Sequence, residues 1–300
     1  MLEQRLLWIL LPDHDDLVAG RVVQDTLSFH STNIEGRKIL APVSVRRFTF
    51  VCASKKNLQD LSTPADGVLG ISPADTSFPK QVTSALGVLP KFYLCLPSST
   101  SGSGHLFVGG GLSFTRTLTP LTSNASSGSY SVTVQSIYVD GVPLPLKPDL
   151  LNGGAKLSSV LPYTILHTDI YSALAKSFTQ RAKAMGISKV REIAPFKDCF
   201  NTRTVGRNLT GPNVPVIEIG VPGRAGEVKW RFYGANTVVK ETKTVMCLAF
   251  LDGGKRLEIH IGTHQIQDYM LEFDLSTSLL GFSDSLLLQS TSCSTWISKK

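Results

Sequence analysis

The sequence predicts a mainly β fold. Most of its 300 residues fall into short runs of β-branched and aromatic residues, separated by Gly, Pro, Asn and Ser. Apolar and polar residues alternate clearly within 130–134 and 257–261, as expected for strands of a sheet with one buried face. Because 42% of the residues are hydrophobic and only 18% are charged, we expect the chain to bury a sizeable core.

The predicted strands follow one another along almost the whole chain. In chain order they are residues 22–29, 45–52, 91–96, 104–110, 130–144, 214–221, 228–234, 244–250, 256–262 and 269–283. The stretch 118–129, LTPLTSNASSGS, is polar and has no periodicity, which predicts a linker between two lobes. The predicted divisions are therefore an atypical N-terminus at 1–17, the remnant of a first lobe at 18–117, the linker, and a second lobe at 130–300.

Two segments have the periodicity of helices instead. Residues 168–186 place apolar side chains at i, i+3, i+4 spacing, with Thr168 expected to cap the start and Gly186 suited to a left-handed end. The segment 77–87 has Pro79 in its first turn, where a missing N–H costs nothing, and it ends in glycine.

The charge pattern limits the classes of partner. The net charge of +7 comes from scattered Lys and Arg residues, so nucleic acid is not expected as a partner. Diffuse positive charge suits an anionic matrix such as an acidic cell-wall polysaccharide. No apolar stretch approaches the ~20 residues of a membrane helix. The stretch 6–11, LLWILL, is too short and follows Glu3, so we expect no membrane partner and no convincing signal peptide.

The polar residues offer few ligands for a metal. The five cysteines contain no Cys-x-x-Cys pair, which favours long-range disulfides and leaves one cysteine without a partner. In an extended strand Glu258 and His260 would share a face with His264, but ordinary strand histidines are the favoured interpretation. No metal and no cofactor is predicted. Two Asn-x-Ser/Thr triplets make Asn124 and Asn208 candidate glycosylation sites of a secreted chain.

The order of the motifs resembles the pepsin-like aspartic proteinase superfamily. Within it, the chain is similar to the plant branch of xylanase inhibitors, extracellular dermal glycoproteins and basic 7S globulins, from about Val18 to Cys293. The similar segments are VVQDTLSF, FTFVCA, ADGVLGIS with FPKQV, GHLFVGG, YSVTVQSIYVDGVPL, APFKDCF and IGTHQIQDYMLEFDLSTSLLGFS. APFKDCF and GGAKLSSVLPYTIL resemble the inhibitor branch in particular. The resemblance implies a bilobal pepsin-like fold whose N-terminal lobe is incomplete because the chain is N-terminally truncated.

The same resemblance implies that the second catalytic acid is missing. Active members carry Gly-Gly-(x)3-Asp-Ser/Thr-Gly in the second lobe. Here Ser158 stands at the Asp position, and Ser159 and Val160 replace the residues that follow it. A serine hydroxyl does not ionise near neutral pH, and a valine crowds a turn that glycine keeps open.

The first catalytic loop is expected upstream of Val18. Asp13, Asp15 and Asp16 lie there without a following Thr-Gly, which is typical of a solvated acidic loop. Hydrolysis by an aspartic proteinase needs two carboxylates that share a proton. The resemblance therefore predicts no catalytic residue in this chain.

The family pattern also implies a set of disulfides. It pairs Cys199 with Cys247 inside the second lobe and Cys95 with Cys293 near the terminus. Cys52 is left unpaired, because its usual partner belongs to the segment that is expected to be absent.

The resemblance implies a catalytically inactive, extracellular protein of the apoplast. It would bind and inhibit cell-wall-degrading glycoside hydrolases, of the endoxylanase or xyloglucanase type, in plant defence. Xylanase-inhibiting relatives use a histidine near the C-terminus, and 283–300 contains none, so the target enzyme stays open. Two alternatives are an aspartic-type endopeptidase and a non-functional, truncated product that resembles a storage globulin.

Overall fold

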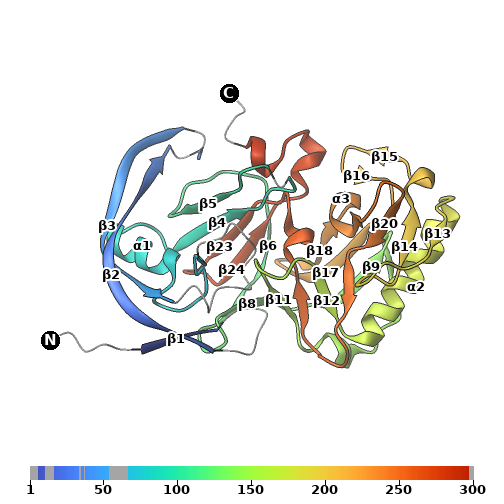
Figure 1. The fold of residues 1–300 in the computed structure, drawn as a ribbon, viewed down its shortest axis with the longest axis horizontal. Coiled ribbons are helices and arrows are strands. Elements are labelled where there is room, and N and C mark those ends of the chain that lie inside the picture. The colour runs from blue at the N-terminus through green and yellow to red at the C-terminus, as the bar shows by residue number, and fades with distance from the viewer. Residues whose placement is uncertain are drawn as a thin grey trace.

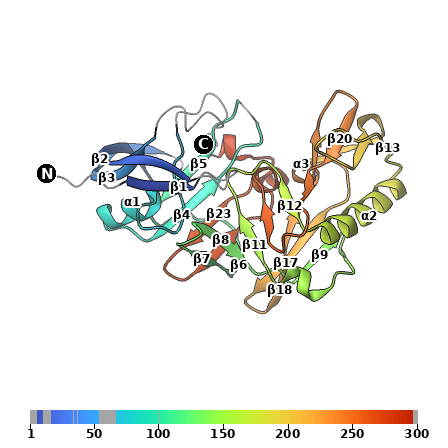
Figure 2. The same cartoon turned by 60° about the horizontal axis from the view of Figure 1, so that its bottom comes forward.

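The architecture is mainly β, as predicted. The computed structural model describes residues 6–10, 17–33, 35–36, 38–53, 67–99 and 101–296. Figure 1 shows a three-stranded sheet with helix α1 (Phe78–Leu86) at one end of the long axis and helix α2 (Thr168–Ala184) at the other. A five-stranded sheet lies between them, and the turned view in Figure 2 has the same order.

The first sheet has the order β1-β2-β3. Its strands are β1 Leu6–Leu10, β2 Leu17–Thr32 and β3 Ile39–Cys52. Val45 and Phe48 of β3 pack against Val82 of α1. Gln81 of α1 also accepts from the backbone N of Thr49 (2.8 Å) and donates to its carbonyl oxygen (2.9 Å). The helix therefore covers one face of this sheet and occupies part of the outer edge of β3.

The five-stranded sheet joins segments that are far apart in the sequence. Its order is β5-β4-β23-β24-β6, with β4 Lys91–Cys95, β5 His105–Val108, β6 Thr117–Pro120, β23 Leu271–Asp274 and β24 Leu279–Phe282. Phe92 of β4 stacks on Phe273 of β23, with ring centroids 4.4 Å apart. Segments from the first and last thirds of the chain therefore share one core.

The stretch 118–129 differs from the irregular linker that was predicted. It holds most of β6 and all of β7 (Thr122–Asn124). The side chains of β7 are exposed, so no apolar alternation indicated a strand there. The division of the chain into lobes at this stretch stays a prediction.

The remaining strands form three sheets and a hairpin. The six-stranded sheet has the order β21-β12-β22-β11-β8-β7, with β8 Ser129–Val132, β11 Ala155–Leu157, β12 Thr164–Leu166, β21 Phe250–Asp252 and β22 Ile259–Ile261. A four-stranded sheet, β10-β9-β17-β18, contains β9 Ser136–Val139, β10 Val142–Pro143, β17 Ile217–Gly223 and β18 Gly226–Phe232. The other, β13-β14-β20-β19, contains β13 Lys189–Val190, β14 Cys199–Asn201, β19 Val238–Lys240 and β20 Val245–Leu248. The hairpin is β15 Arg207–Asn208 with β16 Gly211–Pro212.

Both predicted helices are present. α1 ends at Gly87, which has φ +62° and donates its N–H to a carbonyl of the last turn, as predicted. α2 is capped by His167, whose Nδ1 accepts from the backbone N of Asp169 (3.1 Å), so the predicted cap at Thr168 is wrong. Thr168 is the first helical residue, and its hydroxyl donates to Asp252 instead (2.6 Å). Gly186 follows α2 with φ +79°, as expected.

Short helical turns complete the fold. They are α3 Gly234–Thr237, α4 Thr263–Ile266 and the 3-10 turns η2 Pro148–Leu151, η3 Thr202–Thr204, η4 Leu286–Gln289 and η5 Cys293–Thr295. The apolar residues of the alternation predicted at 130–134, Tyr130, Val132 and Val134, are buried as expected. Leu257, of the alternation predicted at 257–261, is 53% exposed, because β22 begins only at Ile259. Of the helices in the described ranges, none has both the length and the apolar character that a bilayer span requires.

Candidate functional site

Two glycines bring β11 into the middle of the six-stranded sheet. Gly154 has φ +63°, and a Cβ on it would lie 2.8 Å from the carbonyl oxygen of Val132. A Cβ on Gly153 would lie 2.6 Å from the carbonyl oxygen of Leu257. Any larger residue at either position would clash with backbone on one side of the strand. β11 can therefore pair with β8 and β22 at once, and its end carries the turn at 158–161.

Ser158 begins this turn and uses its hydroxyl to stabilise it. The Ser158 Oγ accepts from the backbone N of Leu161 (2.9 Å) and from that of Val160 (3.2 Å). The Ser158 backbone N donates to the carbonyl oxygen of Ile261 (3.0 Å), which extends the pairing with β22. Ser159 is exposed and Val160 is half-buried. The side chain at the expected position of the acid is therefore a hydrogen-bond acceptor for its own turn.

A buried polar network that no pattern in the sequence indicated lies next to the turn. Gln265 Oε1 accepts from both the backbone N and the hydroxyl of Thr164 (2.9 and 2.7 Å). Gln265 Nε2 donates to the carbonyl oxygens of Asn236 (3.0 Å) and Ala249 (2.8 Å). The Thr164 hydroxyl accepts from Gly262 N (3.1 Å). These bonds tie β12, α3 and α4 together beneath the site.

The proposed strand face of Glu258, His260 and His264 does not exist, because His264 lies in α4 and not in β22. Glu258 Oε2 pairs with Lys156 Nζ at 2.7 Å, and this ion pair lowers the pKa of the Glu258 carboxyl. His264 Nε2 lies 3.2 Å from the carbonyl oxygen of Val238, and burial lowers the pKa of its imidazole. Within the described ranges no three ligand-type residues converge on a metal position.

Two further carboxyl groups in the described part of the chain have displaced pKa values, and both are displaced downward. The Lys197 ammonium, the Thr168 hydroxyl and the Gly254 N–H lower the pKa of Asp252 to about 2. Burial opposes ionisation of Asp274, but hydrogen bonds, the strongest from Lys91, hold its pKa below the usual range. A carboxyl pair that shares one proton would instead raise the pKa of one partner.

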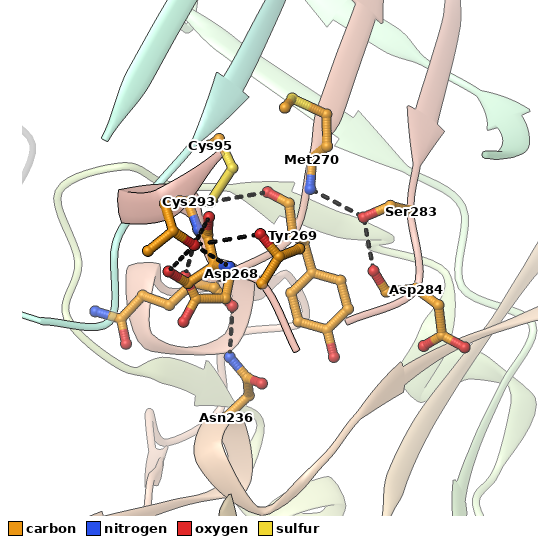
Figure 3. The surroundings of a disulfide bond; sticks show 12 residues. Cys95, Asn236, Asp268, Tyr269, Met270, Ser283, Asp284 and Cys293 are labelled. Atoms are coloured by element: carbon orange, nitrogen blue, oxygen red, sulfur yellow. Dashed lines mark hydrogen bonds between the residues drawn. A yellow bond between two sulfur atoms is a disulfide. The ribbon is translucent and has the colours of Figure 1, made fainter. Parts of the chain in front are cut away.

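The two disulfides are the pairs that the family pattern implies. Cys95 and Cys293 are joined across 198 residues, with an S–S distance of 2.00 Å. Figure 3 shows Asp268 beside this bond. Its Oδ1 accepts from the backbone N of Cys293 (2.9 Å), and its backbone N donates to the carbonyl oxygen of Leu96 (2.9 Å). The C-terminal segment is therefore fixed to β4 by covalent and polar links.

Cys199 and Cys247 are joined between paired positions of β14 and β20. Cys52, at the end of β3, is exposed and is the free cysteine of the part of the chain that the structure describes. Asp13, Asp15 and Asp16, the acidic residues near the expected first catalytic loop, lie outside the described residues.

Comparisons with known protein families agree with this architecture. Residues 11–110 match the family described as xylanase inhibitor N-terminal, and residues 129–284 match the one described as xylanase inhibitor C-terminal. The chain belongs to the xylanase-inhibitor family. The crystal structure of edgp covers 98% of this chain, and the chain covers 77% of that one, with a TM-score of 0.90 and 32% sequence identity. The predicted bilobal pepsin-like fold and the plant branch of the superfamily are thus confirmed.

Two curated relatives of this xylanase-inhibitor-family chain carry different names. Gamma conglutin 1 of Prunus dulcis is 37% identical over 91% of this chain and 65% of its own length. Probable aspartic proteinase GIP2 of Nicotiana benthamiana is 33% identical over 95% of this chain and 71% of its own length. The chain therefore spans about two thirds of the length of these relatives.

Proposed function

We propose that this chain is a binding protein without peptidase activity that inhibits secreted glycoside hydrolases of the endoxylanase or xyloglucanase type. The role of Ser158 carries the proposal. Its hydroxyl accepts two backbone N–H groups of its own turn, at the position where the resemblance expects a catalytic acid. Membership of the xylanase-inhibitor family supports the class of target. We further propose that the protein acts outside the plant cell, in defence.

A glycoside hydrolase of this kind places two carboxylates beside a cleft that binds sugar units. An inhibitor of the cleft needs a projecting cation or hydrogen-bond donor together with an apolar side chain. The β15–β16 hairpin, at the upper right in Figure 1, offers both. Leu209 at its tip is 67% exposed, the largest fraction among the large apolar side chains of the described residues. Arg207 beside it is also exposed.

The hairpin is held in one conformation. Asn208 Oδ1 accepts from both the backbone N and the hydroxyl of Thr210, each at 2.9 Å. The carbonyl oxygen of Thr210 accepts from Ala235 N of α3 (2.8 Å). Gly211 has φ +100° and leaves room for that helix. A loop that is already ordered loses little conformational entropy on binding, which suits an inhibitory contact.

The proposal is tested by titrating the purified chain against fungal endoxylanases and xyloglucanases and measuring residual activity. We expect inhibition of at least one enzyme, weakened about tenfold or more by Leu209→Ser, because an apolar anchor is lost. Leu257→Ser is the matched control, since Leu257 is also apolar and 53% exposed. Flat activity curves for every enzyme would remove the proposal.

Asn124 and Asn208 remain proposed glycosylation sites, and both side chains are exposed. A glycan on Asn208 would stand beside Leu209 on the hairpin. We therefore expect the chain produced in plant cells to inhibit at least as well after enzymatic deglycosylation as before it, since deglycosylation removes the glycan and leaves a side-chain oxygen at position 208. The Asn124→Gln variant, treated in the same way, is the control. Mass spectrometry before and after enzymatic deglycosylation shows which sites are occupied.

An aspartic endopeptidase is the second candidate. The name of the Nicotiana benthamiana relative, probable aspartic proteinase GIP2, favours it. The serine at 158 argues against it, since a hydroxyl cannot supply the second carboxylate of a proton-sharing pair.

A further inference from the structure

Asn152 is the only asparagine of the chain that is followed by glycine. It lies between the 3-10 turn η2 and β11, and it is exposed. Within the described ranges, neither its side-chain amide nor the backbone N–H of Gly153 has a hydrogen-bond partner. A free amide and a free N–H group therefore lie next to each other at this point of the backbone.

These two groups can react with each other. Gly153 N attacks the Cγ of Asn152, a C–N bond forms, and the side-chain nitrogen leaves as ammonia together with the proton of the Gly153 N–H. Water then hydrolyses the cyclic imide, which leaves either aspartate or isoaspartate at position 152. Glycine favours the attack because it has no Cβ beside the nitrogen. The reaction consumes water and needs no oxidant, reductant or cofactor.

The backbone around Asn152 can reach the reactive conformation from the folded state. Asn152 has φ −62° and ψ −24°, so its ψ must rotate before Gly153 N comes within bonding reach of Cγ. The turn is held by hydrogen bonds from Gly154 N to the carbonyl oxygen of Leu151 (3.0 Å) and from Asn152 N to that of Asp149 (3.4 Å). η2 contains no buried residue. A turn with few buried contacts opens locally at a low free energy, without unfolding of the sheet beside it.

We propose that Asn152 is a site of spontaneous deamidation in the folded chain, with water as the reactant, and that its isoaspartate product weakens the attachment of β11. The site lies in the loop before β11 and not in the β15–β16 hairpin. The proposal is therefore independent of enzyme inhibition.

The effect on β11 follows from the packing of the two glycines. Isoaspartate adds one methylene group to the backbone directly before Gly153, where a Cβ would lie 2.6 Å from the carbonyl oxygen of Leu257. The next residue, Gly154, accepts from Ile259 N through its carbonyl oxygen (3.1 Å). The longer backbone cannot keep both contacts unchanged. Aspartate at 152 keeps the backbone length and adds only a charge to an exposed side chain.

Incubation of the full chain at mildly alkaline pH, followed by tryptic digestion and tandem mass spectrometry, tests the proposal. Production in bacteria leaves Asn124 without a glycan, and this exposed asparagine, which precedes alanine, is the internal control. We expect Asn152 to convert at least about tenfold faster than Asn124, because the Cβ of Ala125 hinders the attack. Conversion of Asn152 should be about ten- to a hundredfold slower than in the urea-unfolded chain, since two hydrogen bonds must open first.

Enzymatic methylation of isoaspartate with labelled S-adenosylmethionine gives a second measurement. The label should be lost in Asn152→Gln, a conservative change at an exposed position that keeps the amide. The isoaspartate form, separated by ion exchange, should unfold at lower urea than the unmodified chain.

Four results would overturn the proposal. The first is conversion of Asn152 in the folded chain that is undetectable or more than about a thousandfold slower than in urea, which would show that the turn protects it. The others are equal conversion of Asn152 and Asn124, undiminished labelling of Asn152→Gln, and an unchanged urea midpoint of the isoaspartate form.

Discussion

Replacing Ser158 with alanine tests whether its hydroxyl stabilises the turn after β11. The substitution removes the acceptor of two backbone N–H groups, at 2.9 Å from Leu161 and 3.2 Å from Val160. A neutral hydrogen bond contributes about 0.5–1.5 kcal/mol net, and a half-buried turn is partly rehydrated after the loss. We therefore expect the free energy of unfolding to fall by about 1–2 kcal/mol.

The assay is urea unfolding with the disulfides intact, followed by circular dichroism. The midpoint should move to lower urea while the slope of the transition is unchanged. Ser159→Ala is the control, because Ser159 is the exposed neighbour of Ser158, and it should change the unfolding free energy by less than about 0.5 kcal/mol. Equal effects of the two substitutions, or no effect of Ser158→Ala, would refute a structural role for the hydroxyl.

Three further predictions have distinct signatures. Cys293→Ser opens a loop of 198 residues, and Cys247→Ser opens one of 48 residues. The chain-entropy model predicts that the free energy of unfolding falls by about 5 kcal/mol in the first variant and by about 4 kcal/mol in the second. Calorimetry should therefore find the lower melting temperature for Cys293→Ser. Gln265→Ala removes the buried partner of four hydrogen bonds. It should lower the free energy of unfolding in urea by about 3 kcal/mol or more. A decrease below about 1 kcal/mol would contradict a stabilising role for this network. The pKa of Asp252 is lowered to about 2 in the folded state. The ionised carboxylate therefore stabilises the fold fully above about pH 4, and this contribution is lost as the pH falls through about 2. The free energy of unfolding, measured from pH 5 to pH 2, should fall less steeply in Asp252→Asn than in the unchanged chain.

Much of the fold could be predicted where local pattern and burial coincide. α2 keeps its apolar face buried over the length of the helix, and Gly87 and Gly186 end helices in the conformation expected of them. The order of the motifs indicated the family, and the disulfide pairing came from that resemblance, because the spacing of five cysteines leaves the pairing open.

Other features depend on partners that are distant in the sequence. β6 and β7 were missed because their stability comes from pairing with β24 and β8, and not from an apolar pattern of their own. Thr164, Gln265 and Asn236 look like surface residues in sequence, and their burial becomes favourable only through hydrogen bonds to partners distant in sequence. Thr164 and Gln265 bond each other, and the Asn236 side chain donates to the carbonyl oxygens of His264 and Gln267. The resemblance predicts Ser158 at the position of the acid, and this stays a prediction; nothing in the sequence indicated the two backbone N–H groups that donate to its hydroxyl.

The central claim is that this chain uses a pepsin-like scaffold to bind glycoside hydrolases and does not cleave peptides. Digestion of a peptide library at acid pH, read by mass spectrometry with and without a transition-state inhibitor of aspartic proteinases, tests it most directly. The claim predicts the same peptide spectra in both samples and in a sample without the protein. New cleavage products that disappear with the inhibitor would contradict it.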